Sequence, residues 1–243
     1  MPLRVRPPRR ILAGIAAVPA LALSTLAVGG YFDAQPIAYL DPAGPVHGDE
    51  AVVFLSGDMG LRVGAGEGAV EELRKRGLPV LAINSSGLFG RGRDRAYVDA
   101  LVSDAMRQAL ARPGVHRLAL VGSSFGADVL GTGVGSLPPD LRAKIASVVL
   151  VVPGTDVYFQ ANPSGLTYLG RPDSDPRRTA RLLRGLPVTC IYGLRESETL
   201  CRQPELSNAN IVGIDDGHLM LRHYGELARR VADSALFPPK PMD

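Results

Sequence analysis

LALVGSSFGADVL, residues 118–130, joins an apolar run to the first turn of an expected helix through a glycine-rich corner. Within it, Gly122, Ser124 and Gly126 follow the pattern Gly-x-Ser-x-Gly. Between a strand and a helix this pattern indicates a nucleophile elbow, where a serine occupies a sharp, strained turn and two glycines let strand and helix approach closely. A non-catalytic turn between a strand and a helix can have the same five-residue pattern. Whether Ser124 is a nucleophile must therefore be judged from the rest of the sequence.

Outward from this corner, short apolar runs alternate with amphipathic stretches. The runs have the length and β-branching of buried parallel strands and lie at residues 51–55, 79–83, 117–121, 147–152, 188–192 and, more weakly, 209–214. The stretches with helical periodicity lie at residues 67–77, 94–112, 138–146 and 224–236. This alternation predicts an α/β, doubly wound fold of the α/β-hydrolase type, with a mostly parallel sheet and helices on both faces.

The same pattern sets the expected domain bounds. The length of 243 residues suits one large domain, which we place at residues 51–237. Residues 31–50 are expected to be a linker or edge segment, and residues 238–243 a flexible tail. Residues 153–186 are rich in proline and lack periodicity. So long an irregular insertion is more often a lid or binding loop than filler.

The first thirty residues differ in character from the rest. Four arginines between residues 4 and 10 precede an uncharged apolar stretch at 11–30. This order is typical of a secretory signal, with Ala27-Val28-Gly29 as a small-residue cleavage site, and the Arg9-Arg10 pair hints at twin-arginine export. The stretch is also long enough for an uncleaved membrane anchor, and a buried helix is the third alternative. Either membrane alternative places the remaining chain outside the cytoplasm.

The composition and the motifs argue against binding of a nucleic acid, a metal ion or a cofactor. The net charge is +3, but the N-terminal arginines precede the first acidic residue, and the remainder is close to neutral. The chain has three lysines, no tryptophan and no basic stripe interleaved with aromatic residues. It has neither a P-loop nor a cluster with metal-ligand spacing. Gly64-x-Gly66-x-x-Ala69 resembles a dinucleotide fingerprint, but these glycines do not directly follow a strand and the next strand ends at Asn84 instead of an acidic residue.

A serine nucleophile needs a base, and the base needs a carboxylate that fixes its tautomer. In this architecture both come after the serine, acid first, on loops that follow later strands. His218 lies between the last strand run and the terminal helix, where the base is expected, whereas His223 is expected to be structural. Glu196 and Glu198 both follow the strand at 188–192. We prefer Glu196 as the acid, and Glu198 is the alternative.

Acyl transfer also needs hydrogen-bond donors for the negative charge that develops on the carbonyl oxygen. One donor is expected to be the backbone N–H of Phe125, the residue after the nucleophile. The second should come from the turn after the strand at 51–55, from either Asp58 or Met59. The sequence leaves that choice open.

The two cysteines, Cys190 and Cys201, are separated by about one loop. An even pair in an exported protein favours a disulfide, and the polar segment between them would be stabilised by one. Alternatively, Cys190 is a buried strand residue and Cys201 a free thiol.

Several segments together resemble the VirJ/AcvB family of bacterial virulence proteins, which are exported α/β-hydrolases associated with type IV secretion systems. The matching segments are FLSGD at 54–58, SFGADVL at 124–130, LPPDLRAKI at 137–145, CIYG with TLC within 190–201, and Gly217-His218. The resemblance implies a periplasmic location, a triad of Ser124, His218 and Glu196 or Glu198, and a disulfide between the two cysteines. It also implies hydrolysis of aminoacylated phosphatidylglycerol, such as the lysyl ester, in the membrane.

The chain departs from the family pattern in two places. Family members tend to have Gly-Asp-Gly-Gly-Trp where this chain has GDMGL at 57–61, and a second histidine where this chain has Leu219. These differences affect the oxyanion turn and the surroundings of the base. The reaction type therefore carries over more directly than the substrate.

Two functional hypotheses follow. The first is a serine hydrolase that cleaves a lipid-linked ester at the membrane surface. Apolar residues of the insertion would either contact such a lipid or cap the core, namely Tyr158, Phe159, Leu166, Tyr168 and Leu169. The second is a non-catalytic exported protein that keeps the elbow but binds secretion-system proteins.

Overall fold

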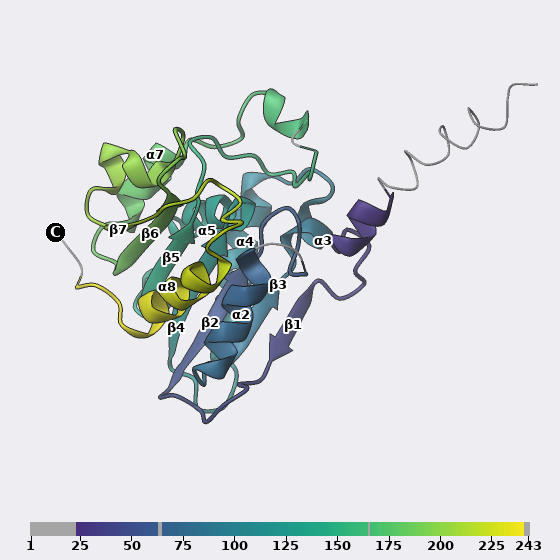
Figure 1. Ribbon diagram of the computed structural model, residues 1–243. Helices are drawn as coiled ribbons and strands as arrows, with labels where there is room; N and C mark the ends of the chain where they lie inside the picture. Colours follow the sequence, from purple (N-terminus) through teal and green to yellow (C-terminus); the bar gives the residue numbers. More distant parts are fainter. Residues whose placement is uncertain (1–22, 63–64, 165, 241–243) are drawn as a thin grey trace, which may run out of the picture.

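The computed structural model describes residues 23–62, 65–164 and 166–240. A seven-stranded sheet forms its centre, in the order β1-β3-β2-β4-β5-β6-β7 (Figure 1). All neighbouring strands are parallel except β1, which runs antiparallel to β3. The strands are β1 (Ile37–Leu40), β2 (Glu50–Leu55), β3 (Val80–Ile83), β4 (Arg117–Ser123), β5 (Ile145–Val151), β6 (Val188–Gly193) and β7 (Asn210–Ile214).

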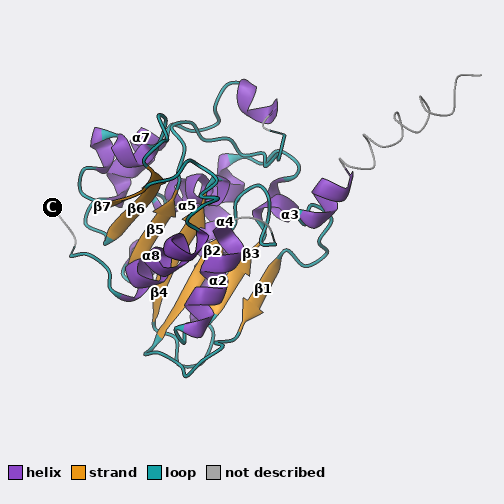
Figure 2. Cartoon of the chain, viewed as in Figure 1, coloured by secondary structure: helices purple, strands orange, loops and turns teal. Residues whose placement is uncertain are grey.

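Helices cover both faces of this sheet (Figure 2). They are α2 (Ala65–Lys75), α3 (Ser85–Phe89), α4 (Arg95–Leu110), α5 (Phe125–Val134), α6 (Pro139–Arg142), α7 (Pro176–Ala180) and α8 (Tyr224–Leu236). Helices α2 and α8 pack together on one face, and α4 and α5 pack together on the other. Because successive strand residues point to opposite faces, Val52 and Phe54 of β2 join one apolar core, and Val53 and Leu55 join the other.

The observed fold confirms the predicted α/β class and all six predicted strands within a few residues. The helix expected at 138–146 is wrong in extent, because α6 ends at Arg142. Residues from Ile145 onward instead form β5, which is buried throughout and pairs with β4 from Leu118 to Ser123. Pairing with a neighbouring strand outweighs the helical periodicity of that stretch.

Residues 153–186, the predicted lid-like insertion, lie between β5 and β6. They contain two short 3-10 turns, η1 (Leu166–Leu169) and η2 (Arg181–Leu183), besides α7. Val157 and Phe159 are buried in the same apolar core as residues of α4 and α5, so part of the insertion is anchored. The remainder crosses above the carboxyl ends of the strands (Figure 1).

The N-terminal region is described from residue 23. Residues 23–28 form a short helix, and the edge strand expected within 31–50 is β1. Most of the predicted signal or anchor segment, residues 1–22, lies outside the described residues, as do Gly64 and the end of the tail at 241–243. Within the described ranges, no helix is both long and apolar enough to cross a bilayer.

Candidate active site

Ser124 lies at the turn between β4 and α5, with φ 51° and ψ −122°. A positive φ is strained for a residue with a side chain, and such strain is often found at functional sites. The flanking glycines are required by close backbone approach. A Cβ on Gly122 would lie 2.5 Å from the carbonyl oxygen of Gly126, and a Cβ on Gly126 would lie 2.3 Å from the carbonyl oxygen of Leu55.

The sheet topology places this turn at a switch point. From β2 the chain crosses to β3 on one side, and then returns past β2 to β4 on the other. Loops that follow β2 and β4 therefore diverge at the carboxyl edge of the sheet, which is where open α/β sheets bind their ligands. The loops after β6 and β7 reach the same edge and supply Glu196 and His218.

The structure brings Ser124, His218 and Glu196 into one hydrogen-bonded chain. The Ser124 Oγ lies 2.9 Å from the His218 Nε2, and the His218 Nδ1 lies 2.7 Å from the Glu196 Oε1. The second oxygen of Glu196, Oε2, accepts the backbone N–H of Gly193 at 2.7 Å. An ionised carboxylate only accepts hydrogen bonds, so Nδ1 carries the proton and Nε2 is free to accept the serine hydroxyl.

Glu196 also controls the charge of the histidine. Its hydrogen bond is the largest influence and raises the pKa of His218 above the ordinary value of 6.5, against the effect of burial. Glu196 itself is 8% exposed, so little water competes for its carboxylate. The other predicted acid, Glu198, is exposed at the pocket wall and has no hydrogen bond or ion pair within the described part of the chain.

Nearby charged residues have structural partners. Asp216 accepts the backbone N–H groups of Gly217 and Arg222, and so shapes the turn that carries His218. His223 precedes α8 and lies 3.3 Å from the Asp216 Oδ2 through its Nδ1. His223 is therefore tied to this turn and takes no part in the Ser124 chain.

The turn after β2 lies beside the serine, as an oxyanion site requires. A Cβ on Gly57 would lie 3.5 Å from the Ser124 Cβ, and Asp58, Met59 and Phe125 all line the same pocket. No backbone carbonyl of the described chain accepts the N–H of Asp58, Met59 or Phe125, although the Asp58 N–H lies close to that residue's own carboxylate. No described carbonyl therefore competes with a ligand oxygen for these N–H groups, and both Asp58 and Met59 stay candidates for the second donor.

The pocket over Ser124 has a volume of about 810 Å³, which suits a small organic ligand. Its wall includes four acidic side chains, Asp58, Asp128, Asp156 and Glu198. No lysine or arginine of the described chain lines it. Nor do the described residues contain a group of three or more side chains that could hold a metal ion.

Asp128 lies one helical turn after Ser124, on α5. Its Oδ1 accepts the backbone N–H of Gly154 at 2.9 Å, and its Oδ2 has no hydrogen bond within the described residues. Burial raises the pKa of Asp128 to about 8 and also raises that of Asp58. The Asp58 Oδ2 accepts the Tyr168 hydroxyl at 3.0 Å, which opposes the effect of burial.

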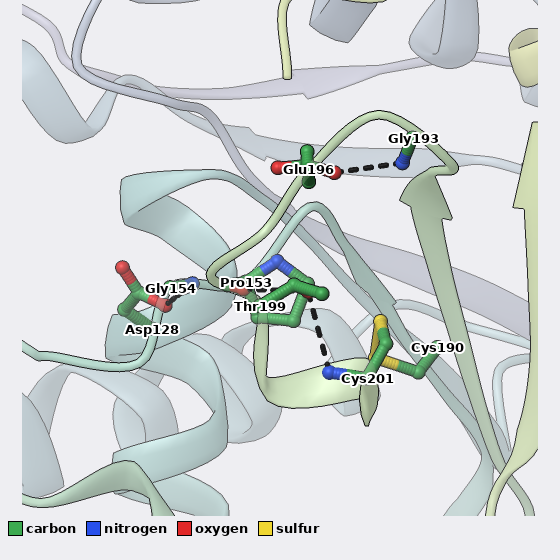
Figure 3. The surroundings of a disulfide bond; sticks show 8 residues. All are labelled: Asp128, Pro153, Gly154, Cys190, Gly193, Glu196, Thr199 and Cys201. Atoms are coloured by element: carbon green, nitrogen blue, oxygen red, sulfur yellow. Dashed lines mark hydrogen bonds between the residues drawn. A yellow bond between two sulfur atoms is a disulfide. The ribbon is translucent and has the colours of Figure 1, made fainter. Parts of the chain in front are cut away.

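A disulfide joins Cys190 of β6 to Cys201 of η3 (Leu200–Arg202), which confirms the predicted bridge (Figure 3). The loop between them carries Glu196. The end of this loop before Cys201 is held by Thr199, whose hydroxyl donates to the Pro153 carbonyl at 3.1 Å. The bridge and this contact fix both ends of the loop that presents the carboxylate to His218.

Sequence reasoning overlooked Asp128 and Tyr31, and it named Tyr168 only as an apolar residue of the insertion, not as a hydrogen-bond donor to Asp58. Asp128 could have been found, because a residue four positions after the nucleophile on a helix shares its face. Tyr168 lies in the irregular insertion, and Tyr31, which donates to the Asp58 carbonyl at 2.9 Å, lies in the segment expected to be a linker. No periodicity marks either tyrosine.

Solved structures that share this fold include proteins described as esterases. Est1E from Butyrivibrio proteoclasticus is 12% identical with a TM-score of 0.60, and the match covers 82% of this chain and 92% of that one. A lipase-esterase related protein from Clostridium acetobutylicum is 14% identical with a TM-score of 0.55, covering 82% and 99%. The Pyrococcus furiosus esterase Pf2001 is 17% identical with a TM-score of 0.53, covering 76% and 82%.

The strand order, the strained serine and these likenesses define an α/β-hydrolase fold with a serine, histidine and glutamate at its carboxyl edge. A family model described as bacterial virulence protein (VirJ) matches residues 49–236, and the chain belongs to this family. No curated protein sequence matches the chain.

Proposed function

We propose that this protein is a serine esterase in which Ser124 is the nucleophile, His218 the general base and Glu196 the acid that orients the base. The observation that carries the proposal is the unbroken chain from the Ser124 Oγ through His218 to Glu196, with contacts of 2.9 and 2.7 Å. A hydroxyl becomes a useful nucleophile when a positioned base takes its proton, and this geometry supplies such a base.

In the proposed reaction the His218 Nε2 takes the hydroxyl proton while the Ser124 Oγ attacks the ester carbonyl carbon. The negative charge that develops on the carbonyl oxygen is stabilised by the N–H of Phe125 and that of Asp58 or Met59. The imidazolium then gives its proton to the departing alcohol, leaving an acyl group on Ser124. A water molecule, deprotonated by the same imidazole, releases the acid and restores the hydroxyl.

We further propose that the acyl group carries an ammonium, as in aminoacylated phosphatidylglycerol and its lysyl ester. Support comes from the acidic wall of the pocket, formed by Asp58, Asp128, Asp156 and Glu198. In their ionised form these carboxylates favour a cationic ligand and disfavour an anionic one. The resemblance to the VirJ/AcvB family implies the same substrate class, and the VirJ family model matches residues 49–236.

The proposed location is the periplasm, with the lipid substrate at the outer face of the inner membrane. The disulfide is in keeping with an oxidising compartment. Leu169, Leu219 and Leu221 are exposed, and the latter two line the pocket. We call these three residues the apolar rim, which a ligand would meet on its way to Ser124. Such a rim suits contact with lipid.

A fluorophosphonate probe tests the catalytic proposal, because it reacts covalently only with an activated serine. We expect the purified chain to be labelled, and Ser124→Ala and His218→Ala to lose the label while melting within a few degrees of the unaltered chain. Ser123→Ala, one residue earlier, is the matched control and should still be labelled. Absence of label on well-folded protein would contradict the proposal and favour a binding role at a secretion system.

A lipid assay tests the substrate. Vesicles that contain lysyl-phosphatidylglycerol are incubated with the unaltered chain or with Ser124→Ala, and free lysine is measured by mass spectrometry. We expect lysine release only with the unaltered chain. Labelling by the probe without lysine release would support the proposed esterase activity but contradict lysyl-phosphatidylglycerol as its substrate.

A further inference from the structure

A short segment before the first strand lies against the oxyanion turn. We call residues 29–33 the N-terminal strap. Gly29 and Gly30 are buried, although they precede the sheet and fall within the predicted signal or anchor segment. The strap also reaches the end of α3, since a Cβ on Gly90, the residue after this helix, would lie 3.0 Å from the Tyr31 ring.

The strap contacts the turn through one side chain and through its backbone. The Tyr31 hydroxyl donates to the carbonyl oxygen of Asp58 at 2.9 Å, and the Ser86 hydroxyl of α3 donates to the same oxygen at 2.8 Å. Gly60, at the end of the turn, has φ +74°, and a Cβ there would lie 2.2 Å from the Gly29 carbonyl oxygen. The two backbones therefore touch, and only glycine fits between them.

Buried polar contacts hold the strap in this place. Asn84, at the end of β3, is 3% exposed, and its Nδ2 donates to the Gly30 carbonyl at 3.0 Å and to the Asp33 Oδ2 at 2.8 Å. Asp33 also pairs with Arg62, just beyond the turn, at 3.2 Å. The strap is thus fastened to the core on one side and to the chain after the turn on the other.

We propose that the strap is a positioning element of the oxyanion site, and that Tyr31 and Ser86 are its positioning residues. This inference rests on the proposed esterase function. The carbonyl of Asp58 and the N–H of Met59 belong to one trans peptide group and point in opposite directions. Two hydroxyl donors on that carbonyl therefore fix the direction of the Met59 N–H, which we take as the second donor to the developing oxyanion.

The strap also bears on processing of the N-terminus. Cleavage after the small-residue site at 27–29 removes Gly29 but leaves Gly30, Tyr31 and Asp33 on the mature chain, whereas cleavage farther along removes these as well. Retention of Tyr31 is accordingly a condition for full activity in either the cleaved or the anchored form.

The test compares Tyr31→Phe and Ser86→Ala with the unaltered full-length chain on a soluble ester. Each variant removes one donor to the Asp58 carbonyl and leaves the triad intact. We expect kcat to fall roughly ten- to hundredfold, less than the 10²–10³ typical of deleting an oxyanion donor outright, with KM within twofold. Inhibition by a trifluoromethyl ketone, which forms an oxyanion on the serine, should weaken by the same factor.

Tyr39→Phe is the matched control, because the Tyr39 hydroxyl in β1 is buried and has no hydrogen-bond partner within the described residues. We expect its kcat and inhibition to equal those of the unaltered chain. Melting temperatures within a few degrees separate a positioning role from a loss of folding. Unchanged kcat in both Tyr31→Phe and Ser86→Ala would overturn this inference alone, whereas an unaltered chain that cleaves no ester would overturn the proposed function together with it.

Discussion

At the residue scale, the pKa of His218 determines the pH range in which the site can act. His218 takes the serine proton only when neutral, and its pKa is raised above 6.5 by Glu196. The rate kcat/KM should therefore fall as pH drops through this raised pKa and be constant above it. Glu196→Gln removes the charge, so we expect the acid limb to move to lower pH in a pH profile of ester hydrolysis.

The plateau of the same variant should also fall, by on the order of 10³ to 10⁴. The Gly193 N–H donates to the side chain at position 196, and in the glutamine variant it can donate only to the amide oxygen. The amide NH₂ then faces the His218 Nδ1, which favours the wrong tautomer. Glu198→Gln is the matched control and should leave the pH profile unchanged. A shifted acid limb in Glu198→Gln would instead identify Glu198 as the acid that pairs with His218.

Asp128 supplies a second prediction at this scale. Its pKa of about 8 leaves it mostly protonated at neutral pH, and only its ionised form attracts a cation. We compare two glycerol esters of the same shape, one with a trimethylammonium acyl group and one with the neutral tert-butyl analogue. The preference for the cationic ester should increase as pH rises through 8, and Asp128→Asn should lower it about tenfold, equivalent to about 1.4 kcal/mol.

Asparagine keeps an oxygen that can accept the Gly154 N–H, so the fold around residue 128 should persist. Hydrolysis of the neutral ester should therefore be unaffected in Asp128→Asn. A variant that retains the cationic preference, or a preference independent of pH in the unaltered chain, would remove Asp128 from substrate recognition.

Residue-level prediction from the sequence depended on chain order. Ser124, Glu196 and His218 could be found because each follows an apolar strand run, and parallel strands present their carboxyl ends at one edge. Glu196 could be preferred as the acid but Glu198 could not be excluded from the sequence, since the two differ only in how the loop after β6 turns. That turn depends on the Gly193 N–H and on the anchoring of Thr199, which are contacts of the folded chain.

At the scale of elements, the junction of β2, β4 and α5 depends on the absence of a side chain at Gly126. A Cβ there would lie 2.3 and 2.4 Å from the carbonyl oxygens of Leu55 and Ser56, which are backbone atoms that cannot rotate away. We expect Gly126→Ala to cost about 1–3 kcal/mol, measured by denaturant unfolding. Gly131→Ala in the same helix meets nothing closer than 4.0 Å and should be neutral or stabilising by up to about 1 kcal/mol.

Equal stability of the two alanine variants would mean that α5 can shift away from β2, and that the elbow is less constrained than the contacts indicate. The sequence could predict this junction because glycine, serine and strand pattern coincide at residues 118–130. It could not predict where α6 ends, because the helical periodicity over 138–146 continues beyond α6. The residues from Ile145 onward pair with β4 and form β5 instead.

At the scale of the whole molecule, the alternation of strands and helices predicted the layers but not the strand order. That order matters, because the return of the chain past β2 to β4 creates the edge at which the site forms. The N-terminal strap was equally hidden. Its hydrogen bonds with Asp58 and Asn84 join residues 27 and 54 positions apart, and local sequence patterns do not encode such pairings.

The last prediction concerns how the whole molecule approaches a membrane. Leu169 is 82% exposed on the insertion above the carboxyl edge, whereas Val46 is 71% exposed in the loop that leads into β2, at the opposite edge. If the apolar rim contacts lipid, Leu169→Glu should reduce vesicle binding in sedimentation and slow hydrolysis of a vesicle-borne ester severalfold, while a soluble ester is cleaved as before. Val46→Glu makes the same change in chemistry and charge away from the rim, so it should alter neither. Equal vesicle binding by the two variants would place the lipid contact elsewhere on the molecule.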